Sequence, residues 1–248
     1  MKTKKVLLAV LLAIAGTTAM SAEEELVVAT DSVVKKEEKA KVEGILQADF
    51  VSQYVWRGLK CGGVSVQPSL GIEYKGLSLS AWGSIGFNPT DTKELDLTLG
   101  YANYNFCVGL TDYWFDTDAY FKYKANNTSH VFEAFAGYDF KYVSLTWYTN
   151  FAGNDGLNSK GKRAYSSYFE INVPFTLATC DWNFTVGCVP YATTFYNAST
   201  FAVTNVALSA SKDIKIKNFT LPLFASLIAN PNEKSAAFVF GFTLNAIQ

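Results

Sequence analysis

Apolar and polar residues alternate with a period of two through most of the chain. Successive side chains of a β-strand point to opposite faces, so this pattern predicts strands with one apolar and one polar face. In the segment 94–102, for example, Leu95, Leu97 and Leu99 share one face and Asp96 lies on the other. A chain patterned in this way forms sheets whose two faces meet different surroundings.

Twelve segments show the pattern, and nearly all of them have nine to thirteen residues. A strand that crosses a bilayer at a tilt needs about 9–11 residues, and outer-membrane barrels have an even number of strands. We therefore predict an all-β fold, an antiparallel transmembrane β-barrel of twelve strands over 44–248. Lipid offers an edge strand no hydrogen-bonding partner, so the first strand should pair with the last. The predicted strands are 45–57, 65–74, 77–87, 94–102, 106–115, 129–139, 142–152, 164–174, 182–191, 200–210, 219–229 and 235–246.

The connections between these segments alternate in length. In chain order, the odd connections have 7, 6, 13, 11, 8 and 5 residues, and the even ones have 2, 3, 2, 7 and 8. Outer-membrane barrels combine long exterior loops with short periplasmic turns. We expect 116–128 and 153–163 to be cell-exterior loops, and both termini to lie on the periplasmic side.

Composition separates a membrane barrel from a soluble sandwich, which would show the same alternation. Hydrophobic residues make up 49% and charged residues 17% of the chain, against about 25% charged in ordinary soluble domains. Aromatic residues also gather at strand ends on the apolar face, as the two interfacial girdles of a barrel require. The predicted periplasmic girdle contains Tyr74, Tyr101, Phe106, Tyr138, Trp182 and Phe219. The predicted outer girdle contains Trp56, Phe87, Trp114, Phe151, Tyr165 and Phe238.

Residues 1–22 predict a secretory signal peptide. Three lysines precede the apolar core Val6–Ala15, and small residues follow, with cleavage expected after Ala22 or Ala19. The charged segment 23–43 is interpreted as a solvated periplasmic linker, with a docking peptide for another envelope component as the alternative. Export together with a barrel pattern predicts the outer membrane of a Gram-negative bacterium.

Several function classes lack the residues that they need. The net charge is −1 without any run of Lys or Arg, so we expect no nucleic-acid partner. His130 is the only histidine. Its same-face neighbour is Phe132, and we expect no outward serine or acid beside it, hence no enzyme.

We find no cofactor motif, and the four cysteines lack a metal-type CxxC spacing and leave disulfide pairing open. They are Cys61, Cys107, Cys180 and Cys188.

The polar, inner phase of the strands is more informative. Seven acids fall on it: Asp49, Glu73, Glu94, Asp96, Glu133, Asp139 and Glu170. Against them stand Lys75 and Arg57, the only arginine in a predicted strand. These charges indicate an ion-pair network that stiffens the barrel, a charged constriction that selects solutes, or both. Inner-phase glycines leave room for bulky neighbours. The pore-lining candidates are Arg57, Glu73, Asp96, Glu133, Glu170, Trp82, Tyr113, Tyr148 and Tyr168.

The segment 49–58 resembles the SxYxxRG signature of the Gcw_chp family of bacterial porins, also called the TorF family. Ser52, Tyr54, Arg57 and Gly58 carry the match, and Gln67 and the run 76–84 are similar to the family's second and third strands. The resemblance implies an outer-membrane barrel with a porin role and no catalytic residues. The chain ends on Ile247-Gln248 rather than on the aromatic residue that barrels often use for assembly. We still expect the usual barrel-assembly machinery and outer-membrane lipid to be its partners.

Strand number sets the diameter of a barrel, so twelve strands predict a lumen narrower than that of general porins with 16–18. The sequence thus favours a narrow, mildly cation-preferring diffusion channel for small polar solutes. The alternative is a non-conducting barrel with a structural, anchoring or ligand-binding role through the loops 116–128 and 153–163. In the first of these loops, Tyr120, Phe121 and Tyr123 could fold into the mouth or meet a ligand.

Overall fold

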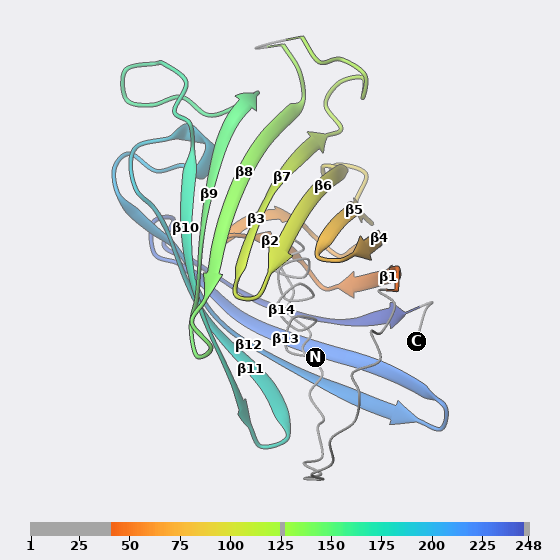
Figure 1. Cartoon of the computed structure of the whole chain (residues 1–248). Coiled ribbons are helices and arrows are strands. Elements are labelled where there is room, and N and C mark those ends of the chain that lie inside the picture. The colour runs from red at the N-terminus through yellow and green to blue at the C-terminus, as the bar shows by residue number, and fades with distance from the viewer. Residues whose placement is uncertain (1–40, 125–126, 246–248) are drawn as a thin grey trace.

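The computed structural model describes residues 41–124 and 127–245. Within them, twelve antiparallel strands form a closed barrel, and two further strands form a small separate sheet (Figure 1). The predicted twelve-stranded, all-β barrel is therefore confirmed. Its wall consists of β1 (Glu43–Val51), β4 (Ser65–Tyr74), β5 (Leu77–Gly86), β6 (Glu94–Asn103), β7 (Phe106–Phe115), β8 (His130–Asp139), β9 (Ser144–Gly153), β10 (Ser167–Leu177), β11 (Cys180–Val189), β12 (Ala202–Ile216), β13 (Phe219–Asn230) and β14 (Ser235–Asn245).

The barrel closes through β1 and β14, as the sequence predicts. Their register places Asp49 opposite Thr243 and Phe50 opposite Phe242. Thr243 donates a hydrogen bond from Oγ1 to Asp49 Oδ1 at 2.6 Å, inside the barrel. On the outer face, the rings of Phe50 and Phe242 stack with their centroids 4.9 Å apart. The seam is thus held by a polar contact on one face and an aromatic contact on the other.

The two-residue turns lie at one end of the barrel, and the longest connections lie at the other. The β4–β5, β6–β7, β10–β11 and β12–β13 turns have two residues each, and φ is positive at Lys75, Tyr104, Ala178 and Lys217. Positive φ is the backbone geometry that two-residue hairpin turns require. The predicted strand 200–210 ends too early, because β12 continues to Ile216. The charged residues near its end stay in the β12–β13 ladder, which reaches the pair Ile216–Phe219.

The predicted first strand, 45–57, is wrong beyond Val51. After a bend at Ser52 and Gln53, the chain leaves the wall and forms a hairpin of β2 (Tyr54–Trp56) and β3 (Leu59–Gly62). We call this segment, Tyr54–Gly62, the lumen hairpin; it is orange in Figure 1. Its two-residue turn is Arg57-Gly58, with φ of 49° and 81°. Arg57 therefore stands at the tip of a hairpin and not in a wall strand.

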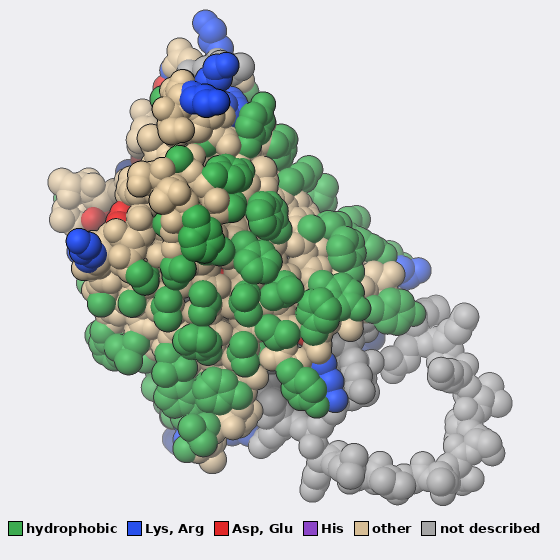
Figure 2. Space-filling view, turned by 90° about the vertical axis from the view of Figure 1, so that its left-hand side faces the viewer, with side chains coloured by type: hydrophobic (Ala, Val, Ile, Leu, Met, Phe, Trp, Pro, Cys, Tyr) green, Lys and Arg blue, Asp and Glu red, His purple; other side chains and the backbone are tan. Residues whose placement is uncertain are grey.

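The two faces of the wall differ as predicted. Figure 2 shows hydrophobic side chains spread over one outer face of the barrel, with charged side chains toward its margins. Large apolar residues of the outward phase remain exposed, among them Leu70 at 59% and Phe240 at 58%. Trp56 is a correction to the predicted outer girdle, because it lies in the lumen hairpin and packs against Tyr113 and Tyr196.

On the inner face, missing side chains make room for large ones. A Cβ atom added to Gly187 would lie 1.8 Å from the Tyr168 hydroxyl oxygen, and one added to Gly109 would lie 2.3 Å from the Phe135 ring. Tyr168 is fully buried. The prediction that inner-phase glycines accommodate bulky lumen residues holds for Tyr168.

The predicted signal peptide at 1–22 and nearly all of the linker at 23–43 lie outside the described residues. The barrel begins with β1 at Glu43. All four cysteines are described, and each is a free thiol. Among the described residues, we find no helix with the length and apolar character needed to cross a bilayer.

Candidate functional site in the barrel lumen

The lumen hairpin carries Arg57 to the opposite wall of the barrel. There its guanidinium group donates to both carboxylate oxygens of Glu133 on β8, from Nη1 to Oε2 at 2.6 Å and from Nη2 to Oε1 at 2.8 Å. Both side chains are nearly inaccessible, at 7% and 1% exposure. Arg57 Nη1 also donates to the hydroxyl of Tyr196 at 2.5 Å, and Tyr113 donates its hydroxyl proton to Glu133 Oε1 at 2.8 Å. This buried ion pair is therefore supported by hydrogen bonds on both partners.

Aromatic rings enclose the same guanidinium group. Its Cζ atom lies 3.9 Å from the centroid of the Tyr148 ring, 4.4 Å from that of Trp56 and 4.7 Å from that of Tyr168. A cation over the face of an aromatic ring is attracted by the ring quadrupole, most strongly where water is excluded. We call Glu133, Tyr148, Tyr168 and Tyr196 the guanidinium cage; Trp56 adds a fourth ring from the lumen hairpin itself. The cage matches both the positive charge and the planar shape of a guanidinium group.

Tyr196 belongs to a segment that sequence analysis assigned to a plain connection. A short 3-10 helix, η1 (Thr194–Tyr196), lies between β11 and β12 and puts Tyr196 into the barrel, where it is fully buried. Burial raises the pKa of Tyr196 above its ordinary value, so its hydroxyl stays protonated and neutral. Nothing in the alternation pattern marks Tyr196, because η1 lies between strands; only its aromatic character in a polar connection could have drawn notice.

A second group of acids lies beside the base of the lumen hairpin. Tyr54 donates from its hydroxyl to Glu94 Oε2 at 2.9 Å, and its ring packs against Trp82. Asp96 shares the inner face of β6 with Glu94 and is 3% exposed. Within the described part of the chain, Asp96 Oδ1 and Trp82 Nε1 are buried without a hydrogen-bond partner. These acids, unlike Glu133, form no ion pair with a basic residue within the described chain.

The nine predicted pore-lining residues differ in burial and in their distance from Arg57. Six strand residues are buried in the lumen: Asp96, Glu133, Trp82, Tyr113, Tyr148 and Tyr168. Glu170 is half-buried and accepts hydrogen bonds from the Tyr168 hydroxyl and from Asn172 Nδ2, both at 2.9 Å. Glu73 is half-buried near the β4–β5 turn and stands apart from the cage. The structure therefore brings Arg57 together with Glu133, Tyr113, Tyr148 and Tyr168, but not with Glu73.

His130 lies on the outward phase, where the sequence places it, but its surroundings differ. The expected absence of an outward acid is wrong, because Asp112 Oδ1 lies 2.7 Å from His130 Nδ1. The loop after β7 covers the pair, with the Tyr120 carbonyl oxygen 2.5 Å from His130 Nε2 and the Tyr123 ring stacked on the imidazole. Burial, followed by the contact with Tyr120, raises the pKa of Tyr123 to about 12. Tyr120 and Tyr123 thus cover His130 rather than fold into the mouth.

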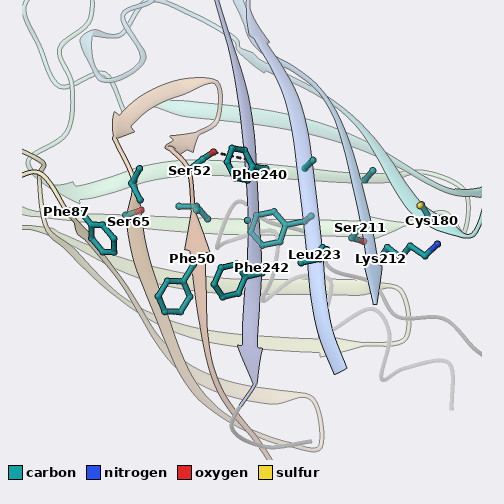
Figure 3. A pocket seen from close by; sticks show the side chains of 16 residues that line it. Phe50, Ser52, Ser65, Phe87, Cys180, Ser211, Lys212, Leu223, Phe240 and Phe242 are labelled. Atoms are coloured by element: carbon teal, nitrogen blue, oxygen red, sulfur yellow. Dashed lines mark hydrogen bonds between the residues drawn. The ribbon is translucent and has the colours of Figure 1, made fainter. Parts of the chain in front are cut away.

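Two hollows of the described part of the structure bear on function. One, of about 660 Å³, is lined almost entirely by apolar atoms along β1, β14, β13 and β12 (Figure 3). Phe50, Phe240 and Phe242 line it, and Ser52 Oγ accepts from the Phe240 N–H at 3.0 Å beside it. The other, of about 610 Å³, has a mixed lining that includes Lys60 and Asp91 beside the lumen hairpin. Only the second offers polar groups to a solute.

The described residues contain no group of three or more His, Cys, Asp or Glu side chains that could hold a metal ion. Comparison with known proteins adds no family: no family model matches the chain, and no curated protein matches it. The function must therefore be argued from the barrel and its lumen.

Proposed function

We propose that the protein is a porin-like barrel of the bacterial outer membrane, with a narrow, mildly cation-preferring path for small polar solutes that the lumen hairpin restricts. One observation carries the proposal: a closed barrel with an apolar outer surface encloses an acid-rich interior. This is the reverse of a soluble β-sandwich, which buries its apolar face. Inserted by the barrel-assembly machinery, such a barrel exposes its apolar surface to lipid.

The outer surface supports a membrane location. Exposed apolar side chains occur on all parts of the wall, including Leu79 on β5, Leu110 on β7 and Leu227 on β13. Soluble monomers rarely expose contiguous apolar patches beyond a few hundred Å². The apolar hollow of Figure 3 fits the same interpretation, since it would meet acyl chains. The signal peptide predicted at 1–22 supports export.

The charge of the lumen supports cation preference. Arg57 is paired with Glu133, so their charges offset each other. The carboxyl groups of Glu73 and Glu170 also lie on the inner face and are only half-buried. Negative groups in a narrow lumen with low-dielectric walls enrich cations and repel anions.

The packing of the lumen hairpin favours a second candidate function, a non-conducting barrel that anchors or binds. Tyr168 and Tyr196 are fully buried, and Trp56 packs edge-on against Tyr113. Packing of this density across the interior leaves little continuous space for a solute unless the lumen hairpin moves. The two candidates therefore differ in whether the lumen hairpin leaves its place.

Single-channel conductance of the purified, full-length barrel in planar bilayers tests the proposal. Wild-type protein should show small or rare openings, and a variant with residues 53–63 replaced by a short Gly-Ser turn should show larger and more frequent ones. Arg57→Gly, which keeps the backbone of the turn, serves as a second variant. Heat-resistant migration on gels verifies that each barrel is folded. Folded variants that never conduct would refute the porin proposal and support the non-conducting barrel.

A further inference from the structure

The side chain of Arg57 is held in the lumen as a ligand would be held. Its polar partners, Glu133 and Tyr196, are separated from it by 76 and 139 positions in the chain. Tyr148 and Tyr168 add ring faces from β9 and β10. The partners thus belong to segments that exist independently of the lumen hairpin, and the hairpin supplies the group that they bind.

The chemistry of these partners selects one kind of cation. Two carboxylate oxygens at 2.6 and 2.8 Å match the parallel N–H groups of a guanidinium plane. A planar, delocalised cation also stacks on ring faces, whereas an ammonium group is a compact and strongly hydrated point charge. Tyr113 donates a hydrogen bond to Glu133 Oε1 and so fixes the orientation of the carboxylate. The arrangement fits guanidinium better than it fits ammonium.

We propose that the guanidinium cage is a ligand-binding site that Arg57 occupies from within the same chain, and that small solutes carrying a guanidinium group are the ligand class that takes its place. The inference deepens the proposed function by naming the solutes that displace the lumen hairpin. The binding site itself does not depend on whether the barrel conducts.

Displacement of the lumen hairpin also separates its other contacts with the interior, among them the packing of Trp56 against Tyr113 and Tyr196. Besides Arg57, its side-chain bonds to the wall include the Tyr54–Glu94 bond, and Asn230 Nδ2 donates to the Gly58 carbonyl oxygen at 3.2 Å. A tethered group has an effective concentration on the order of millimolar or higher. A free solute must therefore exceed that concentration, or make further contacts with the neighbouring acids, to compete with Arg57.

The first experiment removes the Arg57 side chain from the guanidinium cage and measures the binding of small cations in its place. Arg57→Gly removes the side chain, and glycine adopts the positive φ of this position without strain. Calorimetric titration of the folded variant should show methylguanidinium binding at least ten times more tightly than methylammonium. The double variant Arg57→Gly/Glu133→Gln, matched in everything but the carboxylate, should lose this preference. Equal binding of the two probes, or unchanged binding in the double variant, would overturn the proposal. If Arg57→Gly does not fold, Arg57→Asn, which also tolerates positive φ, replaces it in both arms.

The second experiment tests displacement in the wild-type protein. Cys61 is a half-buried free thiol in the lumen hairpin, and Cys107 is a buried free thiol in the wall. At tens of millimolar, free arginine should raise the rate of maleimide labelling at Cys61 several-fold, while lysine should not. Labelling at Cys107 should stay constant and serves as the internal control. No change at Cys61, or the same change with lysine, would overturn displacement. Neither readout measures transport, so a barrel that fails to conduct would refute the porin proposal and leave this one standing.

Discussion

Arg57 and Glu133 form a two-pronged ion pair across the interior of the barrel, with both N–O distances below 3 Å. The pair joins the connection between β1 and β4 to strand β8 on the other side of the lumen. Removing one member of a buried ion pair leaves the other charge uncompensated, which typically costs about 3–5 kcal/mol. The pair should therefore govern both the stability of the barrel and the position of the lumen hairpin.

A double-mutant cycle measures this coupling. Arg57→Gly and Glu133→Gln should each lower the free energy of unfolding by about 3 kcal/mol. The double variant should lose less than the sum, because neither charge is then left alone. Urea unfolding in lipid vesicles provides the measurement, with Glu170→Gln as a matched removal of an inward acid outside the pair. Strict additivity would show that the two residues act independently.

Arg57→Lys should restore only part of the stability that Arg57→Gly loses. A lysine ammonium supplies the charge but cannot donate in parallel to both oxygens of Glu133 while stacking on Tyr148. Its unfolding free energy should lie between those of Arg57→Gly and the wild type. A lysine variant as stable as the wild type would mean that charge alone holds the lumen hairpin.

Ion selectivity should follow the acids that Arg57 does not offset. Under a KCl gradient, the reversal potential should show a modest cation preference that grows as salt is lowered, since the Debye length rises from about 10 Å at 0.1 M to about 30 Å at 0.01 M. Glu170→Gln should weaken the preference. Glu133→Gln should weaken it as well, because it leaves the positive charge of Arg57 uncompensated in the lumen. An anion-selective wild-type channel would contradict the charge argument.

Packing on the inner face predicts a specific rescue. In Gly187→Ala, the new Cβ would overlap the hydroxyl of Tyr168, which should lower the free energy of unfolding by about 1–3 kcal/mol. Tyr168→Phe removes the nearest atom, so the double variant should recover part of that loss. Gly62→Ala is the control, because its Cβ would meet only ordinary contacts at 3.7 Å or more. A double variant less stable than both single ones would exclude the overlap as the cause.

Topology can be tested on intact cells. Epitope tags at Asn127 and Asn158, both at the end of the barrel with the long connections, should be stained from outside. A tag in the Lys75-Gly76 turn should be stained only after permeabilisation. Staining of the turn on intact cells, without staining of the loops, would reverse the orientation.

The barrel was predictable because strand alternation, strand count and turn length all reflect local physics. The lumen hairpin was not. Its residues continue the alternation of β1, so Trp56 fell on the outward phase of a strand that does not extend so far. A period of two cannot distinguish a strand in the wall from a strand inside it. In the pair Arg57-Gly58, only Gly58 favours the positive φ of a hairpin turn, and the direction of the hairpin is set by Glu133 and Tyr196, which lie far away in sequence.

The threading of Arg57 into the interior also constrains the order of assembly. Its partners lie on β8 and in the connection after β11, so the contact can form only after most of the chain has been made. Contacts of such long range form late and slowly. A newly closed barrel would pass through a stage in which its cylinder is complete but its interior still unfilled. The tip of the hairpin would then be the last part of the molecule to dock, and the time before it docks would set how long the interior of an immature barrel stays open.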